Sequence, residues 1–298
     1  MKLLRNDLTT LKPYTRPLGE GSPAVRLHMN ECARDWPPEA RRALLERLAR
    51  LPFRTYPERQ AELTERLRLR LGAPEGGVLL GPSSGALLDL VALAGLRPGD
   101  AVAVPDPGFS LYPLLLDRVG ARMRPVPVGT GFPLKPWRDV LAEGVRQIWL
   151  TLPNNPTGAW VSPEDLEPLL EEAAAQPEPP LVVLDEAYAA FAPRRHRRAV
   201  ERFPNVLLLR TFSKAMASAG WRLGYLLGDP ALVGRLAALQ LPYSLSAPSL
   251  EALDVALDFE AAFRSEVQAI VERRDRLARA LERVATVVPS AANFLWVS

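Results

Sequence analysis

Residues 181–188 read LVVLDEAY, four apolar residues followed directly by an acidic pair. An apolar run without alternation is typical of a strand buried on both faces, as strands of parallel sheets are. Similar short runs recur on either side of this stretch. We expect strands at residues 78–80, 101–104, 122–126, 147–152, 181–184, 206–209 and 223–227.

Amphipathic segments separate these strands and flank them. Ser162 before Pro163 is typical of a helix start, and Gly72 is typical of a helix end. We expect helices at residues 39–51, 58–71, 83–95, 109–120 and from 162 onward, then one helix or two over 249–284 and a last strand over 292–297.

The alternation of strands and helices predicts an α/β domain with a mainly parallel central sheet flanked by helices. We expect this large domain to span residues 36–244. The two chain ends, residues 1–35 and 245–298, would form a smaller α+β lobe.

The composition excludes several classes of protein. The chain has 298 residues, of which 48% are hydrophobic and 24% charged, so it is not disordered on a large scale. A single cysteine, Cys32, cannot form an intrachain disulfide, and with only His28 and His196 we expect no metal site. Charged residues interrupt the first apolar run, and no stretch approaches a membrane span. We therefore expect a cytoplasmic protein without a membrane partner.

The net charge of +3 is a modest excess for binding nucleic acid, so we expect no nucleic-acid partner. Only four of the 37 basic residues are lysines. The one dense basic run, residues 194–198, is either a phosphate or nucleic-acid patch or a solvated loop. No aromatic residues interleave with it, which favours the solvated loop.

Polar residues follow several of the expected strands, at the edge where open α/β sheets bind ligands. Residues 81–85, Gly-Pro-Ser-Ser-Gly, open a helix and can present N–H groups and hydroxyls to an anion, although a turn needed only for tight packing looks the same. Phe109 follows the next strand, where it would stack on a planar ring or fill the core. Residues 153–158, Pro-Asn-Asn-Pro-Thr-Gly, form a turn that presents an amide.

Three charged residues complete this set. Asp185 ends a buried strand, and because an unpaired buried charge is costly, we expect a cation to face it. Lys214 follows the strand at 206–209, and Arg222 lies eight residues further on. Together the strand ends offer an amine, a carboxylate, an amide, a phenol, an aromatic ring, hydroxyls and an arginine. These are the groups that pyridoxal phosphate requires.

Residues 153–158, 185–188 and 213–214, with Arg222, resemble in order and spacing the fold-type I pyridoxal-phosphate aminotransferases. The resemblance covers about residues 10–298. It implies the fold-type I PLP-transferase fold, with an amino donor and a keto-acid acceptor as small-molecule partners. It also implies that Lys214 holds the cofactor as an aldimine and moves a proton at the substrate Cα.

The resemblance implies further roles for residues near Lys214. Asp185 would keep the pyridine nitrogen protonated, Asn155 and Tyr188 would bind the ring oxygen, and Phe109 would stack on the ring. Tyr56 resembles a tyrosine that reaches the cofactor of a neighbouring subunit, which implies a homodimer. The residues implied for the cofactor phosphate are Ser83, Ser84, Thr211, Ser213 and Arg222.

Within this family the chain looks most like the histidinol-phosphate aminotransferases, through residues 11–14 (Leu-Lys-Pro-Tyr), 27–31 (Leu-His-Met-Asn-Glu) and 56–58 (Tyr-Pro-Glu). This implies a ping-pong exchange of an amino group between histidinol phosphate and 2-oxoglutarate in histidine biosynthesis. Tyr14 would then contact the substrate phosphate, or serve only in packing. Threonine-phosphate decarboxylases share most of these features, and other amino-acid aminotransferases share several.

In this family the arginine that pairs with the substrate carboxylate lies beyond the segment that corresponds to residues 292–295. The resemblance therefore places it past Ser298. If the protein lacks this arginine, a cofactor- or partner-binding protein without turnover is the alternative, because the substrate carboxylate would be left unanchored.

Overall fold

The computed structural model describes residues 27–298 and is built on a seven-stranded sheet in the order β1-β7-β6-β5-β4-β2-β3. The strands from β3 to β6 pair in parallel, and β7 runs antiparallel to both β1 and β6. The mainly parallel central sheet is thus confirmed. The strands are β1 Val78–Gly81, β2 Ala101–Asp106, β3 Arg122–Pro127, β4 Gln147–Thr151, β5 Leu181–Asp185, β6 Val206–Thr211 and β7 Gly224–Leu227.

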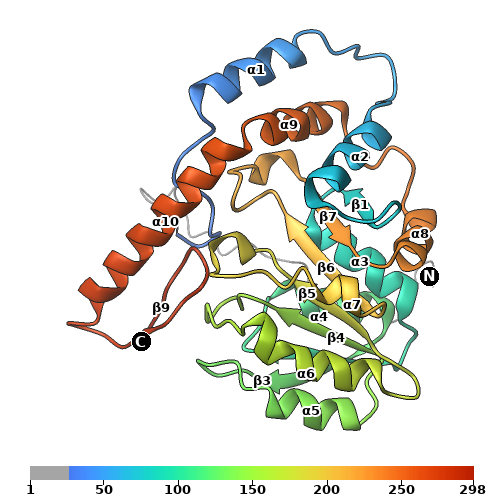
Figure 1. Ribbon diagram of the computed structural model, residues 1–298, viewed down its shortest axis with the longest axis vertical. Coiled ribbons are helices and arrows are strands. Elements are labelled where there is room, and N and C mark those ends of the chain that lie inside the picture. Colours follow the sequence, from blue (N-terminus) through green and yellow to red (C-terminus); the bar gives the residue numbers. More distant parts are fainter. Residues whose placement is uncertain (1–26) are drawn as a thin grey trace, which may run out of the picture.

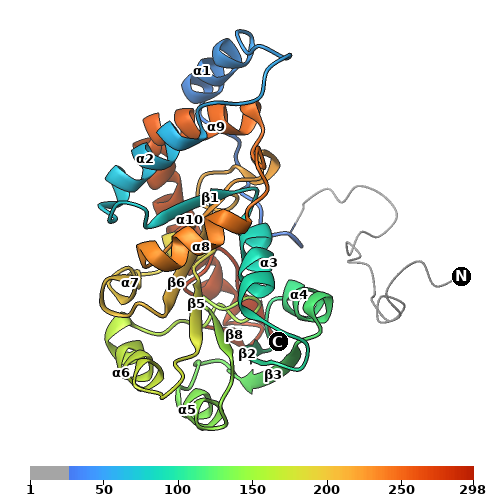
Figure 2. The same ribbon diagram turned by 90° about the vertical axis from the view of Figure 1, so that its right-hand side faces the viewer.

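Helices cover both faces of this sheet (Figure 2). Val183 and Leu207 pack on one face, whereas Val182 and Leu208 pack on the other. Burial on both sides explains why the strands are apolar without alternation. One face carries α3 Ser84–Gly95, α4 Leu111–Val119 and α8 Pro230–Leu239; the other carries α5 Lys135–Ala142, α6 Pro163–Ala174 and α7 Ala199–Arg202.

Four further helices come from residues nearer the chain ends: α1 Pro38–Leu48, α2 Gln60–Leu71, α9 Ala247–Asp258 and α10 Glu260–Leu281. Figure 1 shows α10 along one side of the molecule, with α1 and α9 at the top. Gly72 ends α2 with a φ of 58°, as predicted. The segment 249–284 forms two helices, and the first begins after a Ser246 cap. Two short 3-10 helices are η2 Ala189–Phe191 and η3 Ala219–Trp221.

The strand expected over residues 292–297 is wrong for most of its length. Only β9 Trp296–Val297 is a strand, paired antiparallel with β8 Val287–Val288. Ala292 is held by other contacts, because its N–H donates to Ser290 Oγ at 3.1 Å and its carbonyl accepts from Arg274 at 2.9 Å. A local hydrogen bond and one from α10 thus take the place of a neighbouring strand here.

The solvated loop expected over residues 194–198 is also partly wrong. Arg194, Arg195 and Arg198 are exposed, but the side chain of His196 is buried, with the residue only 2% exposed. His196 hydrogen-bonds to Glu186 through Nδ1 at 3.0 Å and to the Val161 carbonyl through Nε2 at 2.9 Å. Within the described part of the chain, no helix is long and apolar enough to cross a membrane. The domain boundaries at residues 36 and 244 stay a prediction.

Candidate active site

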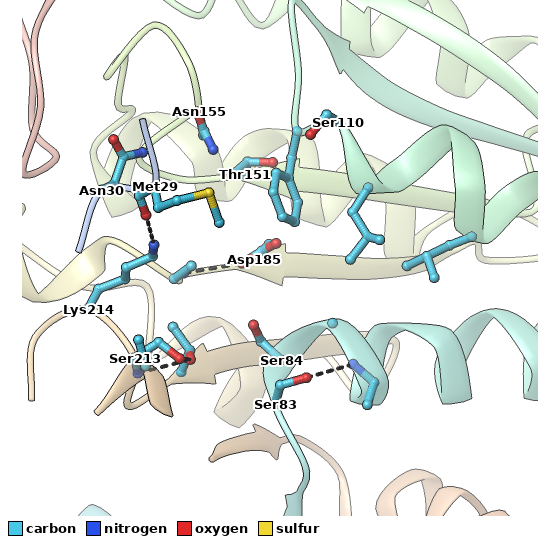
Figure 3. Close-up of a pocket in the computed structure, with 18 of the residues that line it drawn as sticks. Met29, Asn30, Ser83, Ser84, Ser110, Thr151, Asn155, Asp185, Ser213 and Lys214 are labelled. Carbon is cyan, nitrogen blue, oxygen red and sulfur yellow. Dashed lines mark hydrogen bonds between the residues drawn. The ribbon is translucent and has the colours of Figure 1, made fainter. Parts of the chain in front are cut away.

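A cavity of about 1410 Å³ lies at the carboxyl ends of β4, β5 and β6 (Figure 3). It is the place where open α/β sheets bind ligands. Ten of the predicted site residues border this one cavity, although they come from separate segments of the chain. They are Ser83, Ser84, Phe109, Asn155, Asp185, Tyr188, Thr211, Ser213, Lys214 and Arg222.

Asp185 is 4% exposed and sits at the end of β5. Its carboxylate accepts a hydrogen bond from the Tyr112 hydroxyl at 2.9 Å and one from the Ala187 N–H at 3.2 Å. Burial raises the pKa of this carboxyl to about 6, although both hydrogen bonds oppose the rise. The cation expected to face Asp185 is not supplied by the described residues 27–298, in which no basic side chain forms an ion pair with it. Asp185 is therefore suited to form an ion pair with a cationic group of a bound ligand.

Lys214 reaches into the same cavity from the loop after β6 (Figure 3). Its amine donates a hydrogen bond to the Met29 carbonyl at 2.6 Å and lies 5.7 Å from the centre of the Tyr188 ring. Burial lowers the pKa of Lys214, and Arg222 adds to this effect while Glu31 opposes it. A lowered pKa increases the neutral fraction of the amine, which is the form that attacks a carbonyl carbon.

The side-chain amides of two asparagines donate hydrogen bonds to the hydroxyl of Tyr188. Asn30 donates to it at 3.1 Å and Asn155 at 3.5 Å. Asn30 adopts a φ of 51°, a conformation that asparagine tolerates better than most residues, and its carbonyl accepts from Asn293 at 3.1 Å. A group of phenol and amide donors is thus fixed at one side of the cavity.

Hydroxyls and a helix start gather at the other side, near α3. Ser83 caps this helix by accepting from the Ala86 N–H at 3.2 Å, and the N–H groups of the first turn have no partner inside the helix. Thr211 Oγ1 donates to Ser213 Oγ at 2.9 Å. Arg222 borders the same end and donates to the Ala219 carbonyl at 3.0 Å. This combination suits an anion such as a phosphate.

Gly224 allows the α3 turn to lie this close to β6. It pairs with Gly81 of β1 and with Thr211 of β6. A Cβ atom at this position would lie 2.5 Å from the Ser84 N and 2.9 Å from the Arg210 carbonyl oxygen. Only glycine fits here, so this residue sets the spacing between the two hydroxyl-bearing segments.

One predicted residue, Tyr56, does not border the cavity. Tyr56 is 70% exposed and stacks on Tyr243, with ring centres 4.3 Å apart. Tyr14 lies outside the described residues. Phe109 borders the cavity and packs edge-on against Tyr112, with ring centres 5.6 Å apart.

The sequence-based prediction missed Tyr112 and Asn30. Tyr112 is buried and joins Asp185 to Thr151, with 2.6 Å between the two hydroxyl oxygens. Phe109 and Tyr112 are three residues apart in the helix expected over residues 109–120, a spacing that would place both rings on one face and was the available signal. Asn30 belongs to the motif at residues 27–31, but nothing in that motif shows which side chain it contacts.

A buried ionic network lies directly behind Asp185. The next residue, Glu186, is 2% exposed and accepts from Arg210 Nε at 2.8 Å. It also contacts His196 Nδ1 at 3.0 Å and accepts from the His196 N–H at 2.8 Å. Burial alone would raise the pKa of Glu186, but Arg210 and His196 outweigh this effect and lower it. The network fixes the ends of β5 and β6 to each other.

An amine and an uncompensated buried carboxylate on one cavity, at the strand ends of a mainly parallel sheet, define a fold-type I pyridoxal-phosphate enzyme. The comparison with known families agrees. The chain belongs to the aminotransferase class I and II family, whose model matches residues 22–298.

Curated relatives include histidinol-phosphate aminotransferase 2 of Nitrosococcus oceani, 32% identical over 98% of this chain and 81% of the relative. Histidinol-phosphate aminotransferase of Thermococcus kodakarensis is 31% identical over 99% of this chain and 85% of the relative. Among solved structures, histidinol-phosphate aminotransferase of Sinorhizobium meliloti in complex with pyridoxal-5'-phosphate matches with a TM-score of 0.81 and 28% identity, over 90% of this chain and 74% of that one. L-threonine-O-3-phosphate decarboxylase of Porphyromonas gingivalis matches with a TM-score of 0.73 over 87% of this chain and 81% of that one, but at 22% identity it shows the fold alone.

The protein is therefore a pyridoxal-phosphate-dependent aminotransferase, as predicted. The cavity fits this cofactor. Asp185 is a buried carboxylate that needs a cation, and the pyridine ring carries one when protonated. Lys214 offers a desolvated amine for the aldehyde, and the turn before α3 offers hydroxyls and N–H groups for the phosphate.

Proposed function

We propose that this enzyme transfers the amino group of histidinol phosphate to 2-oxoglutarate, giving imidazole acetol phosphate and glutamate. The amino-transfer part of this proposal rests on one observation: Lys214 and Asp185 both line the same cavity. The substrate is supported by relatives named histidinol-phosphate aminotransferase, which are 31–34% identical over 98–99% of this chain.

When bound, pyridoxal phosphate supplies a cationic ring that accepts the electron pair left at the substrate Cα. Asp185 would hold the proton on the ring nitrogen, because its buried carboxylate otherwise lacks a counter-charge. Lys214 would bind the cofactor covalently and move the proton at the substrate Cα, for which its lowered pKa is suited.

The remaining cavity residues would orient the cofactor. Asn155 and Tyr188 would hydrogen-bond the ring oxygen, since their side chains already contact each other. Phe109 would stack on the ring face. The residues proposed for the phosphate are Ser83, Ser84, Thr211, Ser213 and Arg222.

A homodimer is the proposed working unit, with Tyr56 reaching the cofactor phosphate of the partner. Tyr56 is exposed and lies outside the cavity of its own chain, which supports this assignment. Three sequence-based expectations stay predictions: contact of Tyr14 with the substrate phosphate, an arginine for the substrate carboxylate beyond Ser298, and a cytoplasmic location.

The test follows the two halves of the exchange separately. We expect histidinol phosphate alone to convert the visible spectrum of the bound cofactor to that of its aminated form. Addition of 2-oxoglutarate should then restore the first spectrum and release one glutamate per site. Lys214→Ala, the control, should show neither change because it lacks the amine that moves the proton.

Other outcomes would replace the proposed reaction. Release of carbon dioxide from an amino-acid phosphate would identify a decarboxylase on this scaffold. Exchange with other amino acids but none with histidinol phosphate would keep the aminotransferase and reject the proposed substrate. Absence of any spectral change would contradict the roles given to Lys214 and Asp185.

A further inference from the structure

A second cavity, of about 340 Å³, lies behind the cofactor cavity. It is formed between β6 and the helices α2 and α10, which lie on either side of β6 in Figure 1. Ala187 and Thr211 border both cavities, so the two are separated only by the ends of β5 and β6. The apolar part of its wall includes Leu67, Leu71, Phe212, Met216, Phe263 and Val267.

The charged part of the wall carries an excess of positive charge. Two of its arginines, Arg70 and Arg264, share Glu260 at 3.2 Å and 3.5 Å, and Arg210 is paired with Glu186. The remaining arginine is Arg195, which forms no ion pair with any of the described residues 27–298. The Arg195 side chain is exposed to solvent, so a dissolved anion can reach its guanidinium.

Arg195 is exposed, as expected for a residue of a solvated loop, but the backbone on either side of it is held in place. The following residue, His196, is buried and bound to Glu186. The preceding residue, Arg194, is exposed and paired with Glu164 at 2.8 Å. Arg195 therefore differs from Arg194 in two ways. It forms no ion pair with the described residues, and it borders the second cavity.

We propose that this second cavity binds a small organic anion, a monocarboxylate with an aromatic or branched apolar body. Arg195 would pair with the carboxylate, since a planar guanidinium binds this group through two parallel hydrogen bonds. The aromatic and aliphatic wall would cover the apolar body. The volume of 340 Å³ is at the small end of ligand pockets, which range over about 300–1000 Å³.

The test measures binding of 3-phenylpropionate to the enzyme loaded with pyridoxal phosphate, by titration calorimetry. We expect saturable binding that Arg195→Gln weakens about tenfold or more, because a charge-assisted pair is lost. Arg194→Gln is the matched control from the same run, and it should leave the Kd within about twofold. The neutral isostere 3-phenylpropanol should bind about tenfold more weakly than the acid.

A second variant makes the test independent of Arg195. Val267→Glu places a carboxylate in the apolar wall from α10 and should also weaken binding of the acid about tenfold or more. Equal affinity of wild type, Arg195→Gln and Val267→Glu would place the probe in the cofactor cavity instead and overturn the proposal. Absence of saturable binding, or equal binding of acid and alcohol, would overturn it as well.

Discussion

Replacing Asp185 by asparagine should make the cofactor-free protein more stable to unfolding. The same change should greatly lower kcat when pyridoxal phosphate is bound. In the folded chain the pKa of this carboxyl rises from its ordinary value of 3.8 to about 6, chiefly through burial. A raised carboxyl pKa means that the folded state holds the proton more tightly than the unfolded state. The fold therefore loses stability as the pH rises from about 4 to about 6, and the loss is complete above that.

The rise from 3.8 to about 6 corresponds to about 3 kcal/mol, at 1.36 kcal/mol per pH unit. Asparagine carries no charge and can still bond to the hydroxyl of Tyr112. We expect Asp185→Asn to raise the free energy of unfolding of the cofactor-free protein by up to about 3 kcal/mol near pH 8 and by less than about 1 kcal/mol near pH 4. Urea titration at both pH values measures this difference.

Asp106→Asn is the matched control, because Asp106 also ends a strand of this sheet but is exposed. It should change the stability little at either pH. With pyridoxal phosphate bound, Asp185→Asn should lower kcat about 100-fold or more, since the ring cation loses its carboxylate. A cofactor-free Asp185→Asn protein that is no more stable than wild type near pH 8 would refute the reasoning.

Three further predictions concern residues that position the cavity or lie behind it. Tyr112→Phe removes one of the two hydrogen bonds to Asp185 and should weaken cofactor binding by about 1–3 kcal/mol in an equilibrium titration; unchanged affinity would contradict the role of this bond. Gly224→Ala should lower the affinity for pyridoxal phosphate about tenfold or more because its Cβ displaces the α3 turn, whereas Gly234→Ala, with open space around it, should not. Glu186→Gln leaves Arg210 uncompensated and should cost about 3–5 kcal/mol in urea unfolding, part of which Glu186→Gln/Arg210→Gln restores; a fully additive double variant would count against the network.

Most strands of the sheet could be predicted from the sequence because they are buried on both faces, the largely exposed edge strand β3 being the exception. Val182 and Val183 point to opposite sides yet both are apolar, so the run is visible without knowledge of its neighbours. The site was predictable for a related reason. Asp185 and Lys214 each follow such a run, and the carboxyl ends of parallel strands meet at one edge.

The features that were missed depend on contacts between distant segments. Tyr112 reads as an ordinary apolar residue of a helix, and only the fold brings its hydroxyl to Asp185. His196 lies in a run of arginines, and its burial depends on Glu186, which is ten residues away. Residues 292–295 have a strand-like composition, but side chains such as Arg274 bind their backbone instead of another strand.

The central claim is that Lys214 holds pyridoxal phosphate against Asp185. Borohydride reduction of the loaded enzyme, followed by proteolysis and mass spectrometry, tests it most directly, because the chain has only four lysines. We predict the mass of the reduced cofactor on the peptide that contains Lys214 and on no other. A cofactor fixed to Lys135, or no labelled lysine at all, would contradict the account.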